Sequence, residues 1–229
     1  MDRRRTEAGF TLIEILVAVA ILAIASAALT PMVLKYINDG RRARSISDAQ
    51  TLGQSLLAFQ LDTGRWPVSD DGNINDAGEI SRLVGLPFAS IAPAAIPSGV
   101  ATTPGAANWR GGGNGGTAAA LEDILIRNRN ATANPLYAAS LNPAAIPGWN
   151  GPYIKEVPID PWGNPYVVNV RYLDGATVTG VTTAVELSHA VIVISAGANA
   201  LFETSFQDAT ALSVAGGDDI AWTVEGQRP

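Results

Sequence analysis

The chain has 229 residues, of which 47% are hydrophobic and 16% charged, and its formal net charge is −6. An acidic chain is poorly suited to neutralising phosphates, which argues against nucleic acid as the main partner. The sequence contains no cysteine, which excludes disulfides, thiolate metal sites and cysteine nucleophiles. The length and composition suffice for one hydrophobic core.

The first nine residues, MDRRRTEAG, are short, polar and basic, and a long apolar run follows them. Residues 10–30 contain a single charged side chain, Glu14. As a helix rising about 1.5 Å per residue, this run extends about 32 Å, the thickness of a bilayer core. We therefore expect a transmembrane helix half over residues 10–34. The arginines at positions 3–5 favour a cytoplasmic N-terminus, although the basic residues between 35 and 44 weaken that bias.

Beyond the apolar run the pattern becomes amphipathic. Apolar residues recur every three or four positions, at Ile46, Ala49, Leu52, Leu56 and Phe59. Pro31 removes a backbone donor, which is tolerated where neighbouring helices cover the freed groups. Gly64 and Pro67 then end the pattern. The sequence therefore predicts one helix over about 10–61, with its amphipathic half within residues 35–67.

Residues 68–150 are rich in Gly, Pro, Asn and Ala and are expected to form an irregular, loop-rich insertion. Two short helices are predicted inside it, near 77–84 and 117–127. The run GGGNGG at 111–116 is typical of a flexible loop. It lacks the preceding strand and the following GK[ST] of a phosphate-binding loop.

Residues 151–229 alternate turn signals with β-branched and aromatic runs, which indicates an antiparallel sheet and a C-terminal loop. The strongest predicted strand covers 184–195, and the stretch DDIAWTV predicts a last short one. A long helix followed by such a sheet is an α+β arrangement, with the helix packed on a small antiparallel β-sheet.

The carboxylate of Glu14 needs an explanation, because a charge within a membrane helix costs about 2.5–3.5 kcal/mol on insertion scales. If the chain is cut after Gly9, Phe10 carries a free α-amine about one helical turn before Glu14. Opposite unit charges about 4 Å apart attract by roughly 4 kcal/mol at an effective dielectric near 20. The helix macrodipole also favours an acid at this end. Cleavage would thus offset the cost, within one subunit or between subunits of a bundle.

The N-terminal pattern resembles the class III leader of type IV pilins and type II secretion pseudopilins. The matching residues are Gly9, Phe10, Thr11, Leu12, Ile13 and Glu14. The resemblance implies a pilin fold, removal of residues 1–9 by a prepilin peptidase and N-methylation of Phe10. It also implies that Glu14 pairs with the amine of a neighbouring subunit during assembly, in a helix segment that includes Pro31. A head-to-tail contact of this kind that does not close produces a filament.

Two other interpretations of the N-terminus remain open. One is a Sec signal peptide cut at the A-x-A motif Ala25-Ser26-Ala27, although the apolar run exceeds the usual 7–15 residues. The other is a plain signal-anchor helix, which leaves Gly9, Phe10 and Glu14 without a role.

The stretch GPYIKEVPIDPWGNPYVV, residues 151–168, resembles the major pseudopilin of type II secretion. This resemblance implies a structural subunit that polymerises from the bacterial inner membrane to help drive protein export. It implies a single-pass topology with the C-terminal domain in the periplasm. The implied partners are further copies of the chain, minor pseudopilins, the prepilin peptidase, the inner-membrane assembly platform and the lipid bilayer. The alternative is a type IV pilin or minor pilin used for adhesion, motility or DNA uptake. From its residues alone, the stretch is a rigid turn expected to brace the sheet against the long helix.

The C-terminal stretches ISAGANALFETS and AGGDDIAW are similar to a loop that binds calcium in the pseudopilin family. The resemblance implies calcium ligands at Asp218, Asp219 and Asn199, where the family has Asp at the position of Asn199. Ser195 and Asp208 are accessory candidates. Hard oxygen ligands suit Ca²⁺, and the alternative is a solvated acidic turn.

No enzyme signature is found in the sequence. The one histidine, His189, lies beside Ser188 in a predicted strand, where adjacent side chains face opposite sides. No G-x-S-x-G motif is present. The paired carboxylates at 70–71 and 218–219 lie in Gly-rich turns and are better explained by turn chemistry than by acid–base catalysis.

Overall fold

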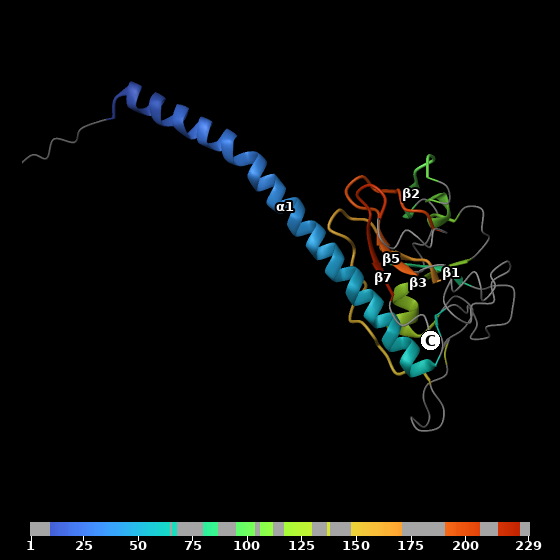
Figure 1. Cartoon of the computed structure of the whole chain (residues 1–229). Coiled ribbons are helices and arrows are strands. Elements are labelled where there is room, and N and C mark those ends of the chain that lie inside the picture. Colours follow the sequence, from blue (N-terminus) through green and yellow to red (C-terminus); the bar gives the residue numbers. More distant parts are fainter. Residues whose placement is uncertain are drawn as a thin grey trace, which may run out of the picture. The chain divides into compact units, whose positions relative to one another are not determined.

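The computed structural model describes residues 10–64, 66–67, 80–86, 95–103, 106–111, 117–129, 137, 148–170, 191–206 and 215–224 (Figure 1). The chain divides into two compact units, Met1–Arg41 and Arg42–Pro229. We call the second of these the head unit. Helix α1, Leu12–Thr63, contributes residues to both units.

The first unit contains the apolar part of α1. Its large apolar side chains between Phe10 and Ile37 are 46–81% exposed. By length and composition this helix could cross a membrane. The helix expected over about 10–61 is confirmed, and it continues through Pro31 without interruption. An apolar surface of this extent requires a cover of lipid or protein.

The head unit is built on a five-stranded sheet in the order β3-β1-β4-β5-β7 (Figure 1). The strands are β1 (Ile80–Val84), β3 (Thr117–Ala120), β4 (Val167–Val168), β5 (Ile192–Ser195) and β7 (Ile220–Thr223). The pairs β1–β4, β4–β5 and β5–β7 are antiparallel, whereas β1 and β3 are parallel. The expected antiparallel sheet is therefore a mixed one. The chain between β1 and β3 is long enough for the crossover that parallel pairing needs.

Four shorter elements lie in the described part of the head unit beside the sheet. Strand β2 (Ser98–Gly99) pairs in parallel with β6 (Leu201–Phe202). The 3-10 helix η3 (Ala106–Trp109) ends in a buried tryptophan, which packs on Phe202 and Phe206 with ring centroids 5.5 and 4.8 Å away. The π-helix η4 (Asp123–Arg127) follows β3 closely.

Two expected short helices are wrong in whole or in part. The helix predicted near 77–84 is strand β1 from Ile80 onward, because five consecutive buried residues pair with strands on both sides. The helix predicted near 117–127 begins as strand β3, and only its second half is helical, at η4. Pairing with β1 overrides the helix propensity of the alanines in β3. Residues 77–79 lie outside the described residues.

The segment expected to be an irregular insertion thus contributes two of the five strands of the sheet. In the C-terminal part, β5 confirms the last four residues of the strand predicted over 184–195. The residues 184–190 of that prediction lie outside the described residues. Strand β7 confirms the last short strand predicted in DDIAWTV.

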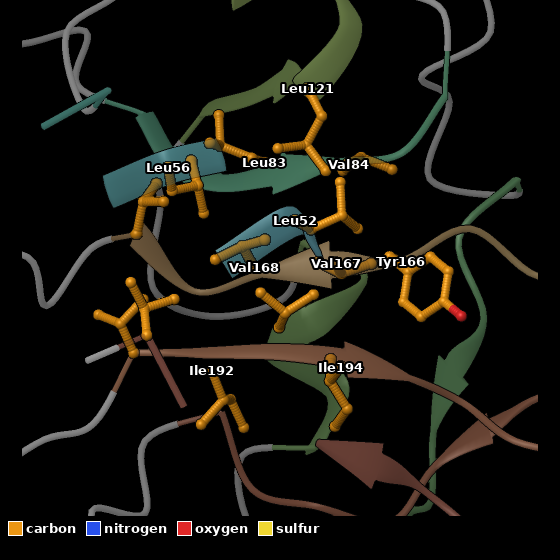
Figure 2. Packing of buried hydrophobic residues seen from close by; sticks show 14 of the residues in the cluster. Leu52, Leu56, Leu83, Val84, Leu121, Tyr166, Val167, Val168, Ile192 and Ile194 are labelled. Atoms are coloured by element: carbon orange, nitrogen blue, oxygen red, sulfur yellow. The ribbon is translucent and has the colours of Figure 1, made fainter. Parts of the chain in front are cut away.

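The core of the head unit lies between the second half of α1 and the sheet. Figure 2 shows Leu52 and Leu56 of α1 among side chains of β1 and β4. The buried stripe of α1 includes Ala49, Leu52, Leu56 and Phe59, as the periodicity predicts. Ser45 is buried at the start of this stripe, where Ile46 was expected. The helix packs closely here, since a Cβ on Gly53 would lie 3.3 Å from the Trp222 ring.

Replacing Leu52 by alanine is expected to destabilise the head unit by about 3 kcal/mol, because Leu52 is fully buried and its loss leaves a cavity. The matched control is Leu61→Ala, because Leu61 lies on the same helix but is 78% exposed. This control is expected to change stability by less than about 0.5 kcal/mol. The measurement is urea unfolding of the full chain in detergent, followed by tryptophan fluorescence, since all five tryptophans lie at position 66 or beyond. Equal losses in the two variants would contradict this account of the core.

Candidate functional site

The N-terminal site begins with Phe10, whose side chain is 78% exposed, and Gly9 lies outside the described residues. Glu14 lies in the first turn of α1. Its backbone N–H donates to the carbonyl oxygen of Thr11 at 3.1 Å and to the Thr11 hydroxyl at 3.3 Å. Thr11 therefore caps the helix start. This cap places the Glu14 carboxylate at the positive end of the helix dipole, which favours its charge.

The apolar surface of α1 surrounds this carboxylate. Leu12, Ile13 and Leu16 are each more than half exposed, so none of them is covered by the chain itself. Pro31 is included in the helix, as expected for a proline near the end of the membrane half. Such a helix presents one carboxylate in an apolar surface that only lipid or other helices can cover.

The second site is the DPWGNP turn, residues 160–165, before β4. Asp160 is buried, with 4% of its surface exposed. One of its oxygens, Oδ1, accepts the N–H groups of Trp162 at 3.0 Å and Asn164 at 2.7 Å. Gly163 has φ of +95°, a backbone conformation that favours glycine. The carboxylate thus closes the turn on itself, in the manner of an Asx turn.

Tyr166 connects this turn to α1. Its hydroxyl lies 3.1 Å from the Ser45 hydroxyl and 3.5 Å from Asp48 Oδ2. Burial raises the pKa of Tyr166, so the hydroxyl stays protonated and can donate. Asp48 in turn forms an ion pair with Arg44. The expectation that this stretch braces the sheet against the long helix is met at Tyr166.

The third site is the carboxylate loop, which we define as residues 195–204 together with residues 215–219. Asp218 Oδ2 accepts the N–H groups of Ala198 at 2.7 Å and Asn199 at 3.0 Å. Asp219 Oδ2 accepts the N–H groups of Glu203 at 2.8 Å and Thr204 at 2.7 Å. Each carboxylate therefore holds a different stretch of the loop with one of its oxygens.

The other oxygen of each aspartate has no such partner. Asp218 Oδ1 and Asp219 Oδ1 are both buried and accept no hydrogen bond. Asp219 itself is only 1% exposed. Burial raises the pKa of Asp219 to about 6, and the nearby charge of Glu203 adds to this, although hydrogen bonds from Thr204 and Glu203 act against it. A buried carboxylate oxygen without a donor is costly, and a cation is one way to satisfy it.

The remaining predicted ligands are placed less favourably. The Asn199 side-chain oxygen accepts the N–H of Leu201 at 2.7 Å and is thereby engaged within the loop. Ser195 donates its hydroxyl to Asp160 Oδ2 at 2.6 Å, which makes it part of the DPWGNP turn's network. Asp208 and His189 lie outside the described residues. Within the described ranges, no three His, Cys, Asp or Glu side chains are grouped as a metal site.

Glu203 is a loop residue that the sequence did not single out. Its Oε2 accepts the N–H of Asp218 at 3.0 Å. A Cβ on Gly217, where φ is +52°, would overlap the Glu203 carboxylate. Glycine at this position therefore lets the Glu203 carboxylate reach the backbone N–H of Asp218. The closely spaced glycines before Asp218 are the signal that could have pointed to this approach.

Comparisons with known proteins agree with these features. The family described as "Prokaryotic N-terminal methylation motif" matches residues 4–30, and "Type II secretion system (T2SS), protein G" matches residues 128–178. The chain is 24% identical to the type II secretion system core protein G of Aeromonas hydrophila, over 72% of this chain and 73% of that protein. It is 24% identical to the corresponding protein of Pseudomonas aeruginosa, over 72% of this chain and 74% of that protein. It is 25% identical to the corresponding protein of Vibrio cholerae, over 72% of this chain and 73% of that protein. No solved structure matched the chain.

A prepilin-type N-terminus on a long apolar helix, followed by an α+β head, defines a type IV pilin-like protein. Within that class, the matched domain and the relatives make the chain most similar to the G-type pseudopilins of type II secretion systems. Pseudopilins of this kind are structural subunits.

Proposed function

We propose that this chain is a structural subunit of a type II secretion pseudopilus. In this proposal a prepilin peptidase cuts after Gly9 and methylates the new amine of Phe10. The mature chain is held in the bacterial inner membrane by the helix half over 10–34, with the head unit in the periplasm. Copies of it then polymerise to help drive protein export. The observation that carries the proposal is Glu14, a carboxylate in the first turn of an exposed apolar helix.

The assembly step follows from the energetics of that carboxylate. In lipid Glu14 costs free energy, and contact with the amine of Phe10 on a neighbouring subunit removes much of this cost. The exposed apolar side chains of α1 supply the surrounding contact, because helices packed together cover one another. Charge pairing thus sets the axial register, and apolar packing supplies the adhesion.

The expected partners are other copies of the chain, minor pseudopilins, the prepilin peptidase and the inner-membrane assembly platform. The alternative, a pilin for adhesion, motility or DNA uptake, is not favoured, because the DPWGNP turn and the relatives point to secretion. Deleting the gene should block export of the secreted substrates and leave surface pili and motility intact. Normal export together with lost motility would contradict the secretion assignment.

A calcium ion in the carboxylate loop is the second part of the proposal. Two buried carboxylate oxygens of this loop have no hydrogen-bond donor, which supports such an ion, because Ca²⁺ prefers hard oxygen ligands. Asp218 and Asp219 would hold it, and Glu203 is a further carboxylate of the same loop that accepts the N–H of Asp218. Asn199 is a weaker candidate, since its oxygen already accepts a hydrogen bond. When bound, the ion supplies positive charge that neutralises the buried carboxylates. Its role is structural.

Adding calcium to the EDTA-treated full chain in detergent is expected to raise the melting temperature of the head unit by roughly 5–10 °C. A ligand present at about 100 times its Kd stabilises the folded state by about 2.7 kcal/mol, and in a domain of this size that stabilisation raises the melting temperature by the stated amount. Asp219→Asn is expected to abolish the increase, because it removes the charge and keeps the shape. Glu156→Gln, an exposed position outside the loop, should retain it. A wild-type chain with the same melting temperature in calcium and in EDTA would remove calcium from the proposal.

A further inference from the structure

The DPWGNP turn contacts the carboxylate loop through its polar side chains. Asp160 uses one oxygen to close its own turn and the other to accept the Ser195 hydroxyl at 2.6 Å. A hydrogen bond from a hydroxyl to a carboxylate is among the stronger kinds in proteins. Both residues are buried, with 4% and 0% of their surfaces exposed. The turn is therefore fixed to the end of β5, where the loop begins.

Asn164 supplies a second connection two residues further into the loop. Its side-chain amide donates to the carbonyl oxygen of Gly197 at 3.0 Å. The N–H of Gly197 donates to the Ser195 hydroxyl at 3.2 Å, so this hydroxyl links both segments. Asp160 and Asn164 together hold residues 195–197 from one side.

Asp218 holds the next two residues from the other side, by accepting the N–H groups of Ala198 and Asn199. At the junction, Gly197 has φ of +64°, and a Cβ there would overlap the backbone carbonyl of Asp218. The loop is thus clamped between the turn and the carboxylate that the calcium proposal uses. A shift of residues 195–197 would move the hydrogen-bond donors that orient Asp218.

We propose that Asp160 and Asn164 are positioning residues that set the calcium affinity of the carboxylate loop. This inference rests on the proposed calcium site. Neither residue is proposed as a ligand. Asp160 already accepts four hydrogen bonds, and Asn164 presents an N–H group to the loop. Their part is to hold the loop in its binding geometry before the ion arrives, which lowers the ordering cost of binding.

The test compares Asp160→Asn and Asn164→Ala with the control Asn169→Ala in the full chain in detergent. Asn169 is a fair match for Asn164, because its amide also bridges two segments, accepting from Ile192 N–H at 2.7 Å and donating to Phe206 at 3.4 Å. Calcium Kd is measured by calorimetry, and melting temperature is measured in calcium and in EDTA. Asn164→Ala, at a partly exposed residue, keeps the test usable if Asp160→Asn does not fold.

The two test variants are expected to bind calcium at least tenfold more weakly and to lose most of the calcium-dependent rise in melting temperature. The control is expected to lower the melting temperature equally in calcium and in EDTA, with unchanged Kd. Test variants that bind calcium as tightly as the wild type would overturn the inference and leave the calcium site standing.

A wild-type chain that does not bind calcium would remove the calcium site and overturn this inference with it. In a wild-type chain that does bind calcium, amide hydrogen exchange of the calcium-free form tests the positioning role directly. Faster exchange at residues 197–204 in Asn164→Ala, but not in Asn169→Ala, would support that role, and unchanged exchange in both variants would overturn it.

Discussion

Replacing Gly9 with alanine is expected to leave the first nine residues attached, so that the chain accumulates as a membrane-bound precursor. The proposed cut falls directly after this residue, and the new side chain would stand next to the bond to be broken. Without the cut, Phe10 has no free amine, and the charge on Glu14 has no partner. Processing and filament formation are therefore expected to fail together, as measured by immunoblot mobility and intact mass.

The matched control for this experiment is Ala8→Ser, which changes the neighbouring leader residue by one atom and keeps Gly9. Normal processing is expected in the control. If Gly9→Ala yielded mature protein of normal mass at the wild-type rate, cleavage after this residue would be contradicted.

Replacing Glu14 with alanine is expected to leave processing intact and to reduce filament yield by orders of magnitude. An ion pair that contributes roughly 4 kcal/mol corresponds to a change of about a thousandfold in the association constant of each subunit contact. Without the carboxylate, the amine of Phe10 is left unpaired in the apolar filament core. Filament yield can be measured by electron microscopy and by pelleting of sheared material.

Leu12→Ala is the control for this variant, because it removes apolar surface from the same turn and leaves both charges in place. It is expected to assemble at a moderately reduced level. Wild-type yield from Glu14→Ala would exclude charge pairing as the basis of assembly, and loss of cleavage in that variant would assign Glu14 to peptidase recognition instead.

The N-terminal motif could be recognised from the sequence because it depends on local order along the chain. Gly9 and Phe10 are neighbours in the sequence, and the spacing to Glu14 is fixed by helix geometry. The same holds for the long helix, whose apolar run and three-to-four residue period identify it without reference to other elements. The buried stripe of this helix differs from the prediction at its start. Ser45 is buried in place of Ile46, because Tyr166 forms a hydrogen bond with Ser45.

The sheet was harder to predict, because its strands are defined by their partners. Nothing within the residues of β1 distinguishes a short helix from a buried strand, and pairing with β3 and β4 decides the matter. Three consecutive alanines in β3 favour a helix locally, yet they pair in parallel with β1. The mixed character of the sheet follows from this single pair.

The carboxylate loop was predictable in its residues but not in its contacts. The sequence places Asp218 and Asp219 in a Gly-rich turn, and the structure adds that each has one buried oxygen without a donor. Ser195 was expected as an accessory ligand, whereas its hydroxyl bonds to Asp160, 35 positions earlier in the chain. The approach of Glu203 depends on the left-handed backbone of Gly217, which sequence spacing does not reveal.

Intact mass together with N-terminal sequencing of the native protein, purified from membranes, tests the central claim most directly. The account predicts a chain that begins at Phe10 and carries one added methyl group on its terminal nitrogen. Retention of residues 1–9, or a chain that begins just after Ala27, would contradict it.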